Sequence, residues 1–516
     1  MTRRLKLAKK LPPQRAPEPE PDMAWKYTNA YFEKGYDSAF GIVDRPWFES
    51  RLRVHLTNSE YEDDDQSWYA LRNMIYASGS RIELSEKSTF SKASQASWPW
   101  FENALSVFTD LLFLPTSIVA VQALALMAYY TEGLGNHLLQ YNLTAAALRL
   151  ACSKGLHRQP PSSWKLPDHE ISHRSWIFWA VYCLDKHVAS RSGRPSTMDD
   201  EEINCQIPTS ISSSSSANVQ ACQILIRLHQ LCSFVLASVS SARAFRQTPN
   251  ELMQTVHGLH QKAEALGREI REITHLNVPL DLTRLPSGMS LYTALAIQFT
   301  YSGLLFDIHT TLTYPWSCGI INLRRHPAMR DQVEKSYTVV ADASREVLLA
   351  TRHIPLDATC PFLFAYYIPI YAMINLFIHI LQAPNLATVH SDLLLMEIGA
   401  AHFTRLEIAT EFQISTPFAK DIAQMARRFV EHAQLPEFPD NDKSNLIERP
   451  LPTDPLDFDQ MNIPDLTEAE ITGEDGMYPT WFDMNIDADM EMWSSLLPIV
   501  EGDGQPPVDF HFSMRH

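Results

Sequence analysis

Apolar residues recur at every third or fourth position along most of the chain, from about residue 27 to residue 435. This spacing places them on one face of an α-helix, whereas the alternation at every second residue that is typical of strands is scarce. The pattern predicts an all-α fold, in which a multi-helix body is built from packed helical hairpins. The clearest hairpin is expected at 117–158, where two apolar runs flank EGLGN (132–136), whose glycines favour a tight turn.

Further helices are expected after a serine-rich loop at 212–216, where the same spacing returns. The run at 361–381 is long enough to cross a bilayer, but Pro369, Asn375 and His379 interrupt it and no basic residues flank it. The sequence therefore favours a core helix over a membrane span, and no membrane partner is expected. The expected helical ranges are about 218–244, 250–275, 288–313, 330–351, 361–381, 385–413 and 416–434.

The two ends differ from this body in composition and charge. Residues 1–26 begin with clustered lysines and arginines and continue with prolines and glutamates, which predicts a basic disordered arm. Residues 436–516 are rich in aspartate, glutamate and proline, which predicts a mostly disordered acidic tail that holds most of the formal net charge of −17. Charged tails of opposite sign favour an interaction protein, and the basic cluster favours a nuclear location.

The sequence offers little of the chemistry that enzymes need. None of the seven cysteines forms a Cys-x-x-Cys pair, so neither a zinc finger nor a redox pair is indicated. A nucleophile elbow, a phosphate-binding glycine loop and a dinucleotide fingerprint are all absent from the sequence. We therefore expect a protein that is not an enzyme and that binds no cofactor.

One stretch, HEISH at 169–173, has the spacing of a zinc peptidase. Two imidazoles one helical turn apart would bind the metal, with Glu170 as the general base. The extended form of the motif requires Gly and His where this chain has Trp176 and Trp179, and Asp168 is expected to be the N-cap of a helix whose first turn is solvated. A zinc peptidase that uses His169, Glu170 and His173 therefore remains an alternative to a chance match.

The rest of that helix has an ordinary interpretation as a core element. Apolar residues at 177, 181, 184 and 188 follow helical spacing, and aromatic residues widen the face that they form. Polar residues lie at the C-terminal end, among them the bases Lys186, Arg191 and Arg194. Bases there suit the negative end of the helix dipole and are expected to bind acids of the following loop, 199–202.

Residues 118–208 combine three short motifs. They are a helix that ends in Gly-Leu-His-Arg, a helix that opens with a Glu–Arg pair and continues with Phe-Trp, Tyr and Leu-Asp, and a Gly-Arg-Pro loop followed by acids. Together they resemble the fungal-specific transcription factor domain, the regulatory middle region of fungal zinc-cluster activators. The resemblance extends more weakly over 27–435. The matching residues are Ala151, Gly155, Leu156, His157, Arg158, Glu170, Arg174, Phe178, Trp179, Tyr182, Leu184, Asp185, Gly193, Arg194, Pro195, Asp200, Ile203 and Pro208.

The resemblance implies a nuclear regulator of RNA polymerase II transcription, whose helical body responds to a metabolite or a partner. It assigns structural roles to the matching residues and makes the two histidines of HEISH incidental. Full-length members usually carry an N-terminal binuclear zinc cluster of six cysteines, whereas no cysteine here precedes Cys152. Zinc is therefore expected only with a cluster upstream of Met1, and DNA would be bound through such a module or indirectly. A second possibility is a regulatory partner of other transcription factors without DNA binding of its own, and a homodimer is left open.

The acidic tail contains a segment, 479–500, with a regular apolar pattern. If this segment becomes helical, five apolar residues spaced 4-4-3-4 share one face, and acids occupy the other faces. Acids around exposed aromatic residues are typical of activation segments that fold on a coactivator. The alternative is that this stripe caps the protein's own helices. The stripe residues are Phe482, Ile486, Met490, Trp493 and Leu497.

Overall fold

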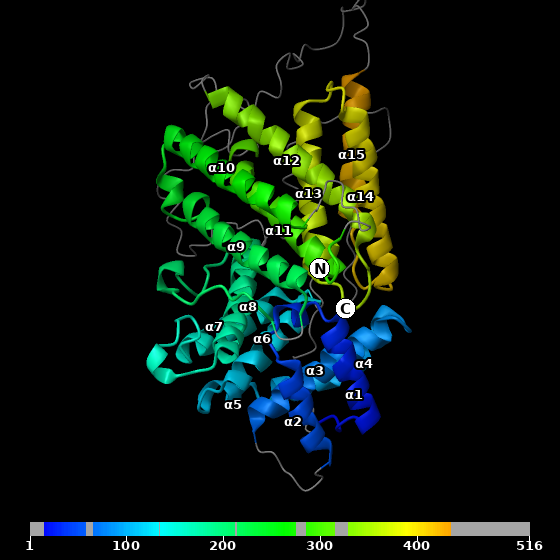
Figure 1. Ribbon diagram of the computed structural model, residues 1–516. Coiled ribbons are helices and arrows are strands. Elements are labelled where there is room, and N and C mark those ends of the chain that lie inside the picture. The colour runs from blue at the N-terminus through cyan, green and yellow to red at the C-terminus, as the bar shows by residue number, and fades with distance from the viewer. Residues whose placement is uncertain are drawn as a thin grey trace, which may run out of the picture.

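The computed structural model describes residues 15–57, 65–133, 135–211, 214–274, 285–314 and 329–434. Every regular element within these ranges is a helix, which confirms the predicted all-α class (Figure 1). The helices are α1 Pro21–Lys34, α2 Arg45–Thr57, α3 Gln66–Ser85, α4 Phe90–Ser106, α5 Phe108–Phe113, α6 Ile118–Glu132, α7 His137–Ser153, α8 Asp168–Ser192, α9 Ser216–Val239, α10 Pro249–Thr274, α11 Leu291–Thr313, α12 Arg330–Ala350, α13 Ile368–Gln382, α14 Val389–Ala409 and α15 Pro417–Ala433, with a π-helical turn Leu363–Tyr367 before α13.

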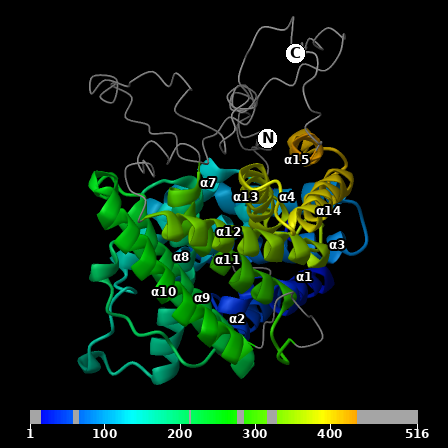
Figure 2. The ribbon, with the colours of Figure 1, turned by 90° about the horizontal axis from the view of Figure 1, so that it is seen from above.

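The helices form four groups that follow one another along the chain. Helices α1 to α5 lie at one end of the molecule, and α6, α7 and α8 lie next to them (Figure 1). Helices α9 to α12 pack side by side as a slanted layer, while α13, α14 and α15 form a neighbouring group (Figures 1 and 2). One continuous hydrophobic core runs through all four groups, from Ala24 to Val430.

The hairpin expected at 117–158 is confirmed as α6 and α7. The side chains of Ser117 and Asn136 accept hydrogen bonds from the backbone at the start of each helix, which satisfies amides that would otherwise lack a partner. The expected later helices are also present, with ends that differ mainly at 218–244, where α9 ends at Val239, and at 385–413, where α14 spans Val389–Ala409.

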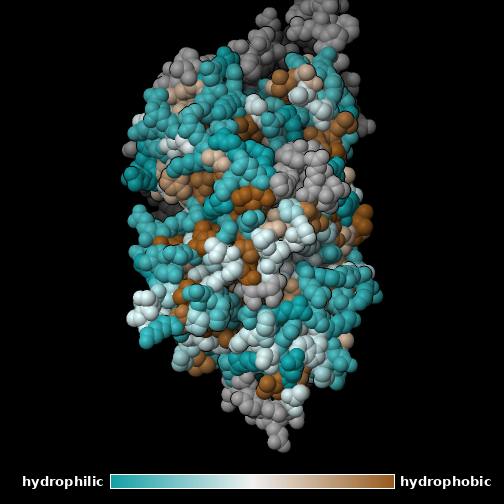
Figure 3. All heavy atoms as spheres, in the orientation of Figure 1, coloured by the Kyte–Doolittle hydropathy of each residue, from teal (hydrophilic) through white to brown (hydrophobic). Residues whose placement is uncertain are grey.

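The apolar run at 361–381 is part of the interior, as predicted. Ile370, Met373, Leu376 and Ile380 of α13 are buried in the core. Two helical segments in the described ranges are long and apolar enough to cross a membrane by length and composition alone. They are Ser216–Val239, 50% of whose apolar window is buried, and Leu363–Gln382, 67% of whose window is buried. Figure 3 shows a mainly hydrophilic face with apolar patches scattered across it.

The prediction of a disordered arm over residues 1–26 is wrong for residues 15–26. Helix α1 already begins at Pro21, and the backbone of Ala16 exchanges two hydrogen bonds with the Asn103 side chain, of 2.9 and 3.0 Å. The Glu18 carboxylate lies 2.9 Å from Arg72 Nε and accepts a 2.7 Å hydrogen bond from Tyr76. Composition misled here because these polar residues meet matching partners on α3 and α4.

The electrostatics of Glu18 reflect this packing. Burial acts to raise the pKa of Glu18, but the contacts with His55, Arg72 and Tyr76 outweigh it and lower the pKa to about 2. A carboxylate held ionised in this way fixes the start of the folded chain against α3. Residues 1–14 and 435–516 lie outside the described residues, as does the predicted stripe at 482–497.

Helices α1 and α3 approach each other closely at Gly79. A Cβ atom at this position would lie 1.9 Å from the Tyr27 carbonyl oxygen, which is a rigid backbone atom. We expect Gly79→Ala to lower the free energy of unfolding by about 1–3 kcal/mol or more, because the two helices must move apart. Urea denaturation followed by circular dichroism measures the change.

The matched control is Gly258→Ala in α10, where an added Cβ meets nothing within 4 Å. Alanine is the better helix former, so this variant should be more stable by about 0.5–1 kcal/mol. Equal effects of the two substitutions would contradict a tight contact between α1 and α3.

Candidate functional site

Helix α8 carries the densest set of residues that the sequence resemblance identified. It starts at Asp168, with Pro167 as its N-cap, so Asp168 is the first helical residue and not the cap that the sequence suggested. Phe178, Trp179 and Tyr182 are at most 2% exposed. Their rings lie 5.1 to 6.1 Å apart and pack mostly edge to face or tilted, which stabilises aromatic clusters. The predicted core face of α8 is confirmed.

The segment after α8 folds back along the helix and is held there by α8 side chains. Gly193 ends the helix with a positive φ of 59°, a conformation that glycine adopts without strain. The Trp179 indole N–H donates to the Gln206 carbonyl at 3.1 Å, and the Trp176 indole donates to the Ser210 carbonyl at 2.6 Å. The aromatic residues thus serve both as core and as anchors for residues 199–211.

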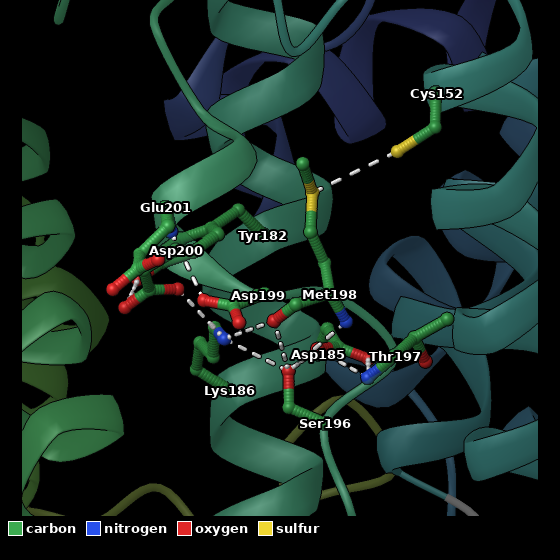
Figure 4. Close-up of polar contacts among 10 residues, drawn as sticks. All are labelled: Cys152, Tyr182, Asp185, Lys186, Ser196, Thr197, Met198, Asp199, Asp200 and Glu201. Atoms are coloured by element: carbon green, nitrogen blue, oxygen red, sulfur yellow. Dashed lines mark hydrogen bonds and ion pairs between the residues drawn. The ribbon is translucent and has the colours of Figure 1, made fainter.

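A buried lysine neutralises the acidic part of this segment (Figure 4). Lys186 is 2% exposed, and its Nζ lies 2.8 Å from Asp200 Oδ1. The same ammonium donates 2.8 Å hydrogen bonds to Ser196 Oγ and to the Met198 carbonyl. Tyr182 donates to Asp200 Oδ2 at 3.1 Å, and burial followed by the Asp200 charge raises the pKa of Tyr182.

Asp185 completes this polar cluster from the next position on α8. Its carboxylate accepts a 2.6 Å hydrogen bond from Ser196 Oγ and longer bonds from the Thr197 amide, of 3.2 and 3.3 Å (Figure 4). Asp185 and Lys186 are both buried, so burying either charge without these partners would cost free energy of folding. We call Tyr182, Asp185, Lys186, Ser196 and Asp200 the loop-anchoring cluster.

The end of α7 is bound to the same segment. Gly155 has a φ of 67°, and the Leu156 amide donates to the Ala151 carbonyl at 3.0 Å, which is the hydrogen bond of a Schellman cap. The His157 carbonyl accepts hydrogen bonds from the amides of Asn204 and Cys205, both 3.1 Å long. The Gly-Leu-His-Arg match is therefore a helix end that positions the segment after α8, and Arg158 pairs with Glu202 at the surface.

The helix-opening residues of α8 lie apart from any cluster of metal ligands. His169 is exposed, whereas His173 Nε2 lies 3.2 Å from the Ile42 carbonyl oxygen, and burial lowers the pKa of His173. In the part of the chain that the structure describes, no group of three His, Cys, Asp or Glu side chains is placed to hold a metal ion. The zinc-peptidase alternative therefore gains no support.

The sequence-matched pair Glu170 and Arg174 also has separate surroundings. Arg174 Nη2 donates to the Lys154 carbonyl at 3.3 Å, and its guanidinium carbon lies 5.9 Å from the centre of the Trp164 ring. Glu170 is half-buried at the start of the helix, where a negative charge suits the helix dipole. Arg174 thus links the start of α8 to the end of α7.

The expectation that bases near the end of α8 bind acids of the following loop is confirmed for Lys186 and wrong for Arg191. Arg191 Nη1 lies 2.9 Å from Glu132 Oε1 of α6, and the guanidinium also donates to Gln140 of α7. Five residues separate Arg191 from Lys186, which turns it by about 140° around the helix and away from the loop. Lys186 therefore meets the loop acids, while Arg194 lies over the Tyr141 ring at 5.3 Å.

Arg191 and Glu132 form the centre of a second buried cluster, which sequence reasoning missed. Glu132 Oε2 lies 3.7 Å from His187 Nε2, and Glu132 Oε1 accepts a 3.3 Å hydrogen bond from the Leu363 amide. The π-helical turn also brings the Tyr367 ring to 5.0 Å from the Arg191 guanidinium carbon. Burial opposes ionisation of Glu132, but the Arg191 charge dominates and lowers the pKa of Glu132.

We call Glu132, Gln140, His187, Arg191 and Tyr367 the buried junction, because it joins α6, α7 and α8 to the segment before α13. π-helical turns are rare, and they often lie at functional sites. The only feature of the sequence that pointed to this cluster was Glu132, a single glutamate at the end of the apolar run of α6. The contact is also long-range, because 231 residues separate Glu132 from Leu363.

Comparison with known proteins agrees with this architecture. Residues 28–273 match the model of the fungal specific transcription factor domain. The chain therefore carries a fungal specific transcription factor domain, which contains α8, the loop-anchoring cluster and most of the buried junction. The match is shorter than the range of 27–435 over which the sequence suggested the resemblance, and α11 to α15 lie beyond it.

Two similar proteins are ABC-transporter-regulating transcription factors. One, from Aspergillus oryzae, is 28% identical over 407 residues, which cover 74% of this chain and 44% of the relative. The other, from Aspergillus fumigatus, is 26% identical over 491 residues, which cover 87% of this chain and 53% of the relative. A negative regulator of pleiotropic drug resistance from Candida glabrata is 27% identical over 28% of this chain and 14% of its own length.

The chain thus spans about half the length of the first two of these relatives. No solved structure matches it significantly.

Proposed function

We propose that this chain is the regulatory portion of a fungal transcriptional regulator, which acts in the nucleus on RNA polymerase II transcription. The observation that carries the proposal is the transcription factor domain at 28–273, together with relatives that are named as transcription factors. The geometry supports a scaffold role, because the polar residues of the loop-anchoring cluster bond to one another and to the backbone. The regulator reaches DNA through a separate DNA-binding module or through a partner regulator.

The names of two relatives suggest which genes to measure first. Both Aspergillus proteins are described as regulators of ABC transporters, and the Candida protein as a regulator of drug resistance. We therefore propose ABC-transporter genes as the targets. Deleting the gene for this chain should change their transcript levels at least several-fold under drug exposure, whereas an unchanged transporter transcriptome would contradict this part of the proposal.

The tail supplies the activation function of this proposal. Its stripe is expected to bind a coactivator groove, with acids keeping the aromatic residues exposed. The test is to fuse the whole chain to a heterologous DNA-binding module and to measure a reporter gene. The fusion should activate the reporter, and Phe482→Ala with Trp493→Ala should remove most of the activation at an unchanged protein level.

A matched control lies in the same tail. Phe510→Ala with Phe512→Ala removes two aromatic residues outside the stripe and should leave activation unchanged. Full activation by the stripe variant would exclude coactivator docking through Phe482 and Trp493. A fusion that never changes reporter output would contradict a role in transcription for the chain itself.

A further inference from the structure

A small cavity opens where the first helices meet the second half of the chain. The loop after α1 contributes Tyr36 and Asp37, and α3 contributes Arg81. Helix α11 contributes Tyr292, and the segment before the π-helical turn contributes Pro361. The cavity therefore has walls from the family domain and from the region beyond it.

Arg81 is a buried cation whose side chain is only partly hydrogen-bonded. Its side chain is 7% exposed, and its Nη1 donates to the Tyr130 carbonyl at 3.1 Å. The guanidinium carbon lies 3.9 Å from the centre of the Tyr130 ring, a cation–π contact. Among the described residues the Arg81 Nε has no hydrogen-bond partner, although the Asp37 carboxylate is close enough to interact with the Arg81 charge.

A buried donor without a hydrogen-bond partner is costly, because buried polar groups in native proteins almost always have one. Arginine is also the side chain best suited to bind a carboxylate, because two parallel N–H groups match its two oxygens. The Arg81 guanidinium thus offers an unused donor to whatever enters the cavity.

The other charged groups of the cavity are already engaged. Lys34 at the mouth pairs with Glu86, and Glu132 is held by Arg191. Asp37 accepts a 3.2 Å hydrogen bond from Tyr31, and burial raises the pKa of Asp37 to about 6, although the Arg81 charge acts to lower it. Protonation of Asp37 in mildly acidic solution would therefore weaken its repulsion of an incoming anion and its hold on Arg81.

The walls around the guanidinium are aromatic. The Tyr36 ring packs edge to face against Tyr129 and Tyr292, with ring centres 6.2 and 6.3 Å apart. Tyr292 in turn stacks on Phe364 of the π-helical turn. A ligand with a flat apolar body would cover these rings, while a charged end met Arg81.

We propose that this cavity binds a small aromatic carboxylate, whose carboxylate pairs with Arg81 and whose ring lies among Tyr36, Tyr130 and Tyr292. Binding would connect α3 and α6 with α11 and the segment before α13, next to the buried junction. The proposal concerns binding alone, so it goes beyond the proposed function and stands whether or not the chain regulates transcription.

The test uses purified full-length protein and phenylacetate as the probe, with phenylacetamide as the neutral ligand of the same shape. Isothermal titration should show saturable binding of phenylacetate and at least about tenfold weaker binding of phenylacetamide, the loss expected for a charge-assisted bond. Phenylacetate should also raise the melting temperature of the wild-type protein. Arg81→Met should lose at least about tenfold in phenylacetate affinity for the same reason.

Gly133→Ala is a second variant that keeps the charge. A Cβ at this position would lie 3.0 Å from Arg81 Nη1, and the backbone there, with φ of −72°, accepts alanine. Gly133→Ala should weaken phenylacetate binding by displacing the Arg81 guanidinium. This variant also tests the role of Arg81 if Arg81→Met fails to fold. Arg158→Met, at the surface and away from the cavity, should bind like wild type. No saturable binding by wild type, equal affinity for the two ligands, or wild-type affinity in Gly133→Ala or Arg81→Met would overturn the proposal.

Discussion

Replacing Arg191 with methionine is expected to lower the free energy of unfolding by about 3–5 kcal/mol, because the substitution leaves Glu132 as a buried charge without its cation. Arg191 and Glu132 have side chains that are only 5% and 6% exposed, so water cannot replace the lost partner. The Leu363 amide and Gln140 remain as donors to Glu132, which limits the loss. Urea denaturation followed by circular dichroism provides the measurement.

Two comparisons separate charge from packing in this prediction. Arg191→Met combined with Glu132→Gln removes both charges and should recover part of the lost stability. Arg158→Met breaks an exposed pair with Glu202 and should change stability by less than about 1 kcal/mol. A loss for Arg191→Met no larger than that for Arg158→Met would contradict the importance of the buried junction.

Trp179→Ala is expected to destabilise the protein by about 3–5 kcal/mol, because it empties a fully enclosed aromatic site. Trp179 is 2% exposed and touches Phe178 and Tyr182, and its loss also leaves the Gln206 carbonyl without its donor. The same urea titration measures the loss. Limited proteolysis should show earlier cleavage within 199–211, because this segment loses one of its anchors on α8.

Trp164→Ala is the matched control, since Trp164 is 56% exposed and should cost less than about 1 kcal/mol. Trp179→Phe keeps an aromatic ring but removes the indole N–H, so it isolates the hydrogen bond to Gln206. If both tryptophan-to-alanine variants were equally stable, α8 could not be the core element that its burial indicates.

Much of the fold was accessible from the sequence because burial along most helices follows the helical period. The hairpin of α6 and α7 was predictable from two apolar runs around paired glycines. The interior position of α13 was predictable as well, since Pro369 and Asn375 argued against a lipid environment. For α8, spacing alone placed Phe178 and Trp179 in the core, which the structure confirms.

Helices α3 to α5 were not predicted one by one, and α3 shows why. Its interior face includes Arg72, Asn73 and Arg81, so polar residues interrupt the apolar period. Each of these side chains depends on groups far away in sequence, such as Glu18 for Arg72 and the Tyr130 carbonyl for Arg81. A periodicity argument cannot detect a buried polar residue whose partner belongs to another helix.

The sequence predicted most residues of the loop-anchoring cluster, but it did not predict which of their side chains interact. The family resemblance named Tyr182, Asp185 and Asp200, which the structure brings together, but it gave no role to Lys186. The assignment of the loop acids to Arg191 failed because the geometry of α8 turns that side chain toward α6. Which of several basic residues faces an acid is decided by helix rotation and packing, and both require coordinates.

The contact between Leu363 and Glu132 has a practical consequence for anyone who expresses this protein in pieces. The family match ends at residue 273, yet Glu132 accepts a hydrogen bond from the amide of Leu363, which lies 90 residues beyond that end. Helix α9 also packs on α11, which lies beyond the match. A fragment that stops at the domain boundary would expose the hydrophobic surface of α9 that packs on α11 and would leave Glu132 without its hydrogen bond from the Leu363 amide. We therefore expect soluble material to require the chain to continue through α15.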